Sequence, residues 1–69
     1  MSKLEILGQN IKKYRLKKGL TQLKLSIELG LSYEYICRVE KGQKYMSLRK
    51  LFELADILGV DFYKLTNFK

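Results

Sequence analysis

The sequence has no histidine, no proline and no tryptophan, and it has a single cysteine, Cys37. One cysteine cannot form an internal disulfide, and without histidine it argues strongly against a zinc site. The absence of proline removes the strongest helix breaker. The sequence also lacks a glycine-rich phosphate loop and paired carboxylates on a rigid frame. It therefore predicts no enzyme, no cofactor, no metal and no small-molecule ligand.

Long apolar segments are missing as well. No run approaches the roughly 20 apolar residues that a membrane-spanning helix needs. The N-terminus lacks the apolar block of a signal peptide. We therefore expect a cytoplasmic protein whose Cys37 stays a free thiol, because disulfides are rare in that compartment.

Charged residues, in contrast, are abundant and unbalanced. Fourteen lysines and arginines stand against seven aspartates and glutamates, which gives a formal net charge of +7 and a pI near 9.7. This balance indicates an anionic partner, either nucleic acid or an acidic membrane surface. A chain of 69 residues is expected to form one domain, residues 1–69. So small a domain is marginally stable, which makes dimerisation the expected reinforcement.

Apolar spacing, caps and glycines divide the chain into five short helices. They are expected over residues 3–18, from Thr21 to residue 29, from Ser32 to residue 41, from Ser47 to residue 58, and after Asp61. Four glycines, at positions 19, 30, 42 and 59, stand where helices commonly end on a left-handed residue. The pattern predicts an all-α fold, a compact five-helix bundle. Capped segments with their own core argue against a peptide that lies on a membrane.

The second and third predicted helices, joined by Gly30-Leu31-Ser32, form a helix-turn-helix arrangement. The motif comprises Gly-Leu-Thr-Gln at 19–22, Leu-Ser at 25–26, Leu-Gly-Leu-Ser at 29–32, Tyr-Ile-Cys-Arg-Val-Glu-Lys-Gly at 35–42, Ser-Leu at 47–48 and Leu-Gly-Val at 58–60. In this order and spacing, the chain resembles the lambda and 434 repressor and Cro (XRE-like) family over residues 7–66. Ser26 departs from the alanine usual in that family. Its hydroxyl is expected to bond back to the Gln22 carbonyl.

The resemblance implies a lambda repressor-like fold and sequence-specific binding to double-stranded DNA. It implies a small dimeric transcriptional regulator of the repressor, Cro-like or restriction-modification controller type. Antitoxins and co-regulators share this fold, so a chain whose main partner is a protein is the alternative. The operator and the sign of regulation stay open.

A helical wheel of residues 33–41 separates an apolar side from an outward arc. The arc holds Tyr33, Glu34, Cys37, Arg38 and Lys41. In the family this arc faces the major groove, and residues at the positions of Tyr33, Glu34 and Arg38 commonly read base edges. Arg38 is the candidate for bidentate contact to guanine, and Glu34 either accepts from cytosine or repels misplaced phosphate. Cys37 joins this set by its place in the arc, with a passive spacer as the alternative.

Residues that flank the arc are expected to contact the DNA backbone. They are Gln22, Ser32, Tyr35, Lys41, Gln43 and Lys44. For Lys44, contact with a base is the alternative. Gln22 opens a helix, where free N–H groups attract an anion, and Ser32 and Tyr35 offer hydroxyl donors. The resemblance further implies a partly buried, structural ion pair between Arg15 and Glu40, which ties the first helix to the recognition helix.

Aromatic residues crowd the end of the chain. Tyr63 and Phe68 are the expected core of a dimer interface, to which Phe52 and Ile57 of the fourth helix contribute. Such a dimer would set two recognition helices one DNA turn apart. The expected partner is therefore an operator with an inverted repeat.

Overall fold

The computed structural model describes residues 1–68, and Lys69, the last residue of the predicted domain, lies outside them. Residues 1–68 form five α-helices: α1 (Lys3–Lys18), α2 (Gln22–Leu29), α3 (Tyr33–Glu40), α4 (Leu48–Leu58) and α5 (Phe62–Leu65). The predicted all-α fold is confirmed, although α3 ends one residue earlier than expected. No helix among the described residues is both long and apolar enough to cross a membrane.

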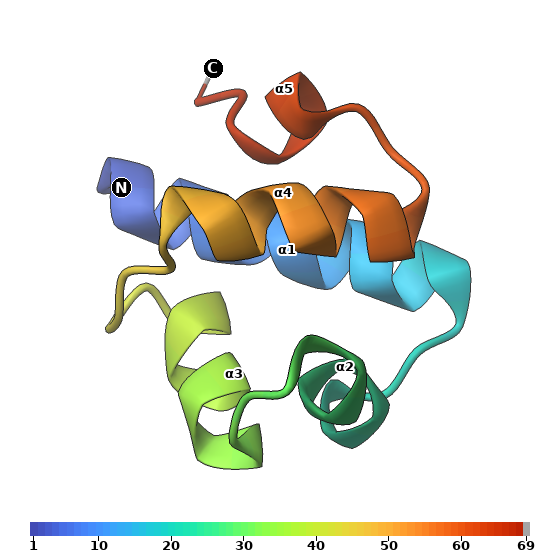
Figure 1. Cartoon of the computed structure of the whole chain (residues 1–69). Coiled ribbons are helices and arrows are strands. Elements are labelled where there is room, and N and C mark those ends of the chain that lie inside the picture. The colour runs from blue at the N-terminus through green and yellow to red at the C-terminus, as the bar shows by residue number, and fades with distance from the viewer. Residues whose placement is uncertain (69) are drawn as a thin grey trace.

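The helices surround one core, in which α1 and α4 lie side by side (Figure 1). α5 packs on one side of this pair, and α2 and α3 pack on the other. The most deeply buried apolar side chains come from all five helices: Ile11, Leu25, Ile36, Val39, Leu54 and Leu65. Because α3 contacts α1 and α2 contacts α4, the helix-turn-helix pair is held in one orientation by the rest of the bundle.

Hydroxyl side chains begin four of the helices, as N-caps that accept a backbone N–H three residues on. They are Ser2, Thr21, Ser32 and Ser47. The last three follow the sequence prediction, whereas the capping box between Ser2 and Glu5 adds a start signal that the sequence analysis missed. The Ser2 backbone N–H lowers the pKa of the Glu5 carboxyl. This cap therefore stabilises α1 above the ordinary carboxyl pKa and weakens as acid protonates Glu5.

α5 begins differently. Asp61 stands at its N-cap position but makes no side-chain capping bond, so the predicted location is right and the capping interaction is not formed. α5 is a single turn, and it is held by the buried side chain of Leu65 rather than by its cap.

Gly8 allows α1 to approach the end of α3 closely. A Cβ at this position would lie 2.5 Å from the carbonyl oxygens of both Val39 and Glu40. Those oxygens belong to backbone, which has little freedom to move away. Glycine at position 8 is therefore required for this helix crossing. Its position inside a predicted helix does not by itself indicate this role.

Ser26 is buried in α2. Its hydroxyl donates to the Leu23 carbonyl at 2.6 Å, so the predicted bond to the Gln22 carbonyl is wrong. A helical serine can reach the carbonyl three or four residues back, and here it takes the nearer one. The buried hydroxyl is thus satisfied, and serine fits the site as a small residue.

Candidate nucleic-acid interface

The outward face of α3 carries most of the side chains that the wheel predicts. Tyr33, Glu34 and Arg38 are exposed, whereas Ile36 and Val39 on the opposite face are buried. Tyr33 is 51% exposed although it is a large aromatic residue, so it offers a ring and a hydroxyl to a partner. A hydrogen bond with the Cys37 thiol raises the pKa of the Tyr33 hydroxyl above its ordinary value.

An ion pair joins Glu34 and Arg38 on this face. Arg38 Nη2 lies 2.8 Å from Glu34 Oε1, and Arg38 Nε donates to the same oxygen at 3.0 Å. Both side chains are largely exposed, so the pair adds little to stability. Its effect is geometric, because Glu34 holds the guanidinium on the outward face of the helix.

Arg15 and Glu40 form a second ion pair, which is buried beneath α3. Arg15 Nε lies 2.7 Å from Glu40 Oε2, and Arg15 Nη2 donates to Glu40 Oε1 at 3.1 Å. Arg15 Nη1 also donates to the Leu20 carbonyl at 2.7 Å. Both carboxylate oxygens and all three guanidinium nitrogens therefore have partners, and the arginine faces inward rather than toward a ligand.

Gln22, the first residue of α2, reaches from its half-buried position toward α3. Its Nε2 donates to Glu40 Oε1 at 3.0 Å, and its Oε1 accepts from the Cys37 thiol at 3.2 Å. Cys37 is accordingly half buried and turned toward α2 rather than standing free on the outward arc. The structure thus brings together residues that the sequence analysis assigned to three separate roles.

The segment that follows α3 is held by Tyr35. The hydroxyl of this half-buried side chain donates to the Tyr45 carbonyl. A phenol has one proton to donate, and in this structure Tyr35 gives it to the Tyr45 carbonyl. Ser32 differs, because its hydroxyl only accepts, from the Tyr35 N–H at 3.1 Å, and keeps its own proton.

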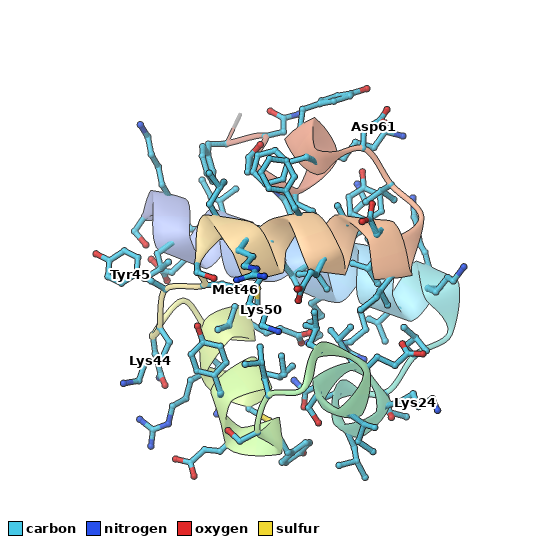
Figure 2. The ribbon with its side chains drawn as sticks, in the orientation of Figure 1. Lys24, Lys44, Tyr45, Met46, Lys50 and Asp61 are labelled. Atoms are coloured by element: carbon cyan, nitrogen blue, oxygen red, sulfur yellow. The ribbon has the colours of Figure 1, made fainter. Side chains whose placement is uncertain are left out.

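An open hollow of about 220 Å³ lies between α3 and this segment, lined by Ser32, Glu34, Tyr35, Arg38 and Lys44. Lys41, Gln43 and Lys44 are all exposed. Figure 2 shows Lys44 and Tyr45 extending outward beside the end of α3. Two cationic groups, one of them paired with the Glu34 carboxylate, and a free hydroxyl proton therefore surround a recess next to the outward face of α3.

The residues predicted for a dimer interface lie on α4, α5 and the tail. Phe52, Tyr63 and Phe68 are exposed, and Ile57 is half buried. The Phe52 ring stacks on Phe62, with 4.4 Å between ring centroids, so this aromatic pair also joins α4 to α5. Leu48, which was not among the predicted interface residues, lies one turn before Phe52 on α4 and is 60% exposed.

Two polar side chains tie the elements together and were not predicted. Lys50 of α4 donates to the Leu29 carbonyl at the end of α2 at 2.8 Å and pairs with Glu53 at 2.9 Å. Asn10 of α1 donates from Nδ2 to the carbonyls of Leu65 and Asn67, at 3.0 and 2.9 Å. Neither residue belongs to a recognisable motif, so only the tertiary structure reveals these contacts.

A metal centre has no evident place in this arrangement. Residues 1–68 contain no group of three or more histidine, cysteine, aspartate or glutamate side chains that could hold a metal ion. The exposed features are instead a polar helix face, lysines beside it and an aromatic surface on the far side of the bundle.

Comparison with known families places the chain in a class. A family model described as helix-turn-helix matches residues 11–65, which is most of the chain. The chain therefore belongs to the helix-turn-helix family. Its general function is that of a DNA-binding transcriptional regulator.

Individual relatives agree with this class. An HTH-type transcriptional regulator, y4dJ, of Sinorhizobium fredii is 34% identical over 65 residues, which is 94% of this chain and 84% of that protein. The control protein C.BamHI of Bacillus amyloliquefaciens is 33% identical over 64 residues, covering 91% of this chain and 79% of that protein.

A solved structure extends the agreement to the fold. The restriction-modification controller protein C.AhdI from Aeromonas hydrophila superposes with a TM-score of 0.83 and 35% identity, over 90% of this chain and 94% of that one.

Proposed function

We propose that the chain is a homodimeric transcriptional regulator that places α3 in the major groove of an inverted-repeat operator. The observation that carries this proposal is the contrast between the two faces of α3. The outward face presents Tyr33 and the Glu34–Arg38 pair, and the inward face is fixed to the core by apolar packing and the Arg15–Glu40 pair. A rigidly held helix with an exposed donor-rich face is what base readout requires.

Within this proposal Arg38 donates to guanine O6 and N7, and its ion pair with Glu34 keeps the guanidinium on the outward face of α3. Tyr33 contacts a thymine methyl with its ring, or a base or phosphate with its hydroxyl. The backbone contacts are the first turn of α2 with Gln22, the N-cap Ser32, and the exposed Lys41, Gln43 and Lys44 after α3. Tyr35 acts on this surface indirectly, because it fixes the segment that carries Lys44.

The experiment that tests readout is selection of bound duplexes from a random DNA pool. We expect one sequence with two inverted half-sites whose centres lie about 34–36 Å apart. Affinity for it should fall linearly with salt on a log–log plot, with a slope set by the number of phosphates contacted. A pool that yields no enriched sequence would contradict sequence-specific binding.

The dimer is tested separately by sedimentation equilibrium. Tyr63→Glu puts a charge on the proposed interface, and Leu16→Glu is the matched control, because Leu16 is also an exposed apolar residue but lies on α1. We expect wild type and the control to be dimers and Tyr63→Glu to dissociate. A wild-type monomer at high micromolar concentration that protects one asymmetric half-site would refute the dimer.

The controller type is the best-supported subtype, because two of the relatives are named as controllers or control proteins. A regulator of this class acts where the DNA is, so we place it in the cytoplasm. Genes for a DNA methyltransferase and a nuclease beside its own gene would support this subtype. A neighbouring toxin gene would instead support an antitoxin.

One observation favours the second candidate, a co-regulator or antitoxin whose main partner is a protein. An open groove between α2 and α4 carries the exposed Ile27 beside three carboxylates, from Glu28, Glu53 and Asp56, in a chain of net charge +7. Within residues 1–68, only Glu53 of these three is paired, with Lys50. Such a groove suits a basic segment with apolar side chains. If Ile27→Glu abolishes copurification with a co-expressed neighbouring gene product and leaves DNA binding intact, the chain has this second function.

A further inference from the structure

Gln22 occupies a position between two elements that a DNA-binding protein must align. It begins α2, and its side chain lies between Glu40 and Cys37, both on α3. Glu40 in turn is fixed to α1 through Arg15. One amide group therefore connects the first turn of α2 to the inner edge of α3.

Chemistry decides which way this amide points. The buried Glu40 is paired with Arg15, so its ionised carboxylate only accepts hydrogen bonds, and the Gln22 nitrogen must face it. The Gln22 oxygen then faces Cys37, and since an amide oxygen also only accepts, the thiol must be the donor. The orientation of the amide and the donor role of Cys37 follow from each other.

The first turn of α2 retains free donors at the surface. The first N–H groups of an α-helix have no acceptor within the helix, and Thr21 caps only the Lys24 N–H. The Gln22 amide has two protons, one of which is directed to Glu40. These donors border an open groove lined by Arg15, Thr21, Gln22, Leu23 and Tyr33.

We infer that Gln22 and Cys37 are positioning residues that fix the phosphate-binding end of α2 against the base-reading face of α3. Cys37 then contributes to DNA binding through Gln22, without touching a base and without being a passive spacer. This inference rests on the proposed DNA-binding function. It assigns the half-buried thiol a role that its place on the helical wheel alone would not give.

The test measures DNA affinity for Cys37→Ala, Cys37→Ser, Gln22→Ala and the double variant Gln22→Ala/Cys37→Ala, on the selected operator and its single-base variants. Because one hydrogen bond of a weak donor is lost, Cys37→Ala should bind about threefold more weakly on every sequence alike. Cys37→Ser keeps a donor and should restore affinity. The double variant should bind no more weakly than Gln22→Ala alone, since the same link is already broken.

Arg38→Ala is the control for base readout, because its loss should be confined to one base pair. A Cys37→Ala loss of that kind would show that Cys37 acts in base readout, either directly or through the Tyr33 hydroxyl, and would overturn the inference. Unchanged affinity, or losses that add in the double variant, would overturn it as well. Thermal melting of each variant excludes unfolding as the cause.

A second measurement needs no DNA. In ¹H–¹⁵N spectra of the free protein, the Gln22 side-chain NH₂ signals should shift and exchange faster with water in Cys37→Ala, and should return toward wild type in Cys37→Ser. If they do not respond, the link is absent and the inference fails, whatever the DNA results. If they respond but wild type binds no duplex, it is the proposed function that fails, and the role of these residues in binding falls with it.

Discussion

The Arg15–Glu40 pair lies beneath the C-terminal end of α3, whereas the Glu34–Arg38 pair lies on the outer face of the same helix. Arg15 and Glu40 are less than 10% exposed as side chains, at 7% and 3%, and are fully hydrogen bonded. In the outer pair, Arg38 and Glu34 are 48% and 74% exposed. Both pairs join an arginine to a glutamate, and they differ in their exposure to solvent.

That difference separates two roles for one kind of interaction. If one member of a buried pair is removed, the other is left as a charge that water does not reach. The buried pair therefore strongly disfavours any displacement of α3 that separates its two members. An exposed pair exchanges partners with water and ions at little cost. The inner pair therefore fixes where α3 lies, and the outer pair leaves Arg38 available to a ligand.

The largest effect should come from breaking the inner pair. Arg15→Ala strands Glu40 as a buried charge and should cost about 3–5 kcal/mol of folding free energy. Urea unfolding checks this, and the double replacement Arg15→Met/Glu40→Leu should be more stable than either single change. Arg15→Ala that melts normally but binds DNA poorly would instead place Arg15 on the DNA.

A smaller loss should follow from crowding the helix crossing that carries Glu40. Gly8→Ala drives a methyl group against two backbone carbonyls and should cost about 1–3 kcal/mol of stability, as overpacked sites do. Gln9→Ala is the control, since Gln9 is the next residue of α1 and is exposed. Equal melting temperatures for the two variants would mean that α1 and α3 have room to separate.

The outer pair should affect binding and not folding. Arg38→Ala should lose about 1–3 kcal/mol of binding free energy at one base-pair position, whereas Lys41→Ala should weaken all sequences alike. Affinities for single-base operator variants distinguish the two. A uniform loss for Arg38→Ala would identify it as a phosphate contact, and the comparison of the two pairs would then rest on burial alone.

The smallest effect is expected from Glu34→Gln, which neutralises the exposed partner. Stability should change by only about 0.2–0.5 kcal/mol, typical of an exposed pair one helical turn apart. If Glu34 chiefly orients Arg38, discrimination at the base pair read by Arg38 should also weaken. Loss of discrimination at a second, neighbouring position would show that Glu34 reads a base itself.

Helix ends were predictable from the sequence because they depend on local chemistry. Thr21, Ser32 and Ser47 accept N–H groups three residues away, and the glycines that follow α1, α2, α3 and α4 take a left-handed conformation. The exposed face of α3 was predictable for the same reason. It follows from the helical period and the choice of buried side.

Contacts between elements were not predictable in this way. Tyr35, Gln22 and Cys37 were each expected to contact DNA, and each forms a hydrogen bond to another part of the chain. Which partner a polar side chain takes depends on separations between helices that no local pattern encodes. Gly8 is similar, because its necessity appears only once α3 crosses α1.

Asn10 has a consequence for how two copies of the chain would meet. With its amide group bonded to the carbonyls of Leu65 and Asn67, it fastens the end of the described chain to the middle of α1. Tyr63 of α5 and Phe68 thereby belong to a segment that is bonded to the bundle within a single copy of the chain. A surface prepared in this way loses less conformational entropy on contact, so even a small aromatic patch could support a useful affinity.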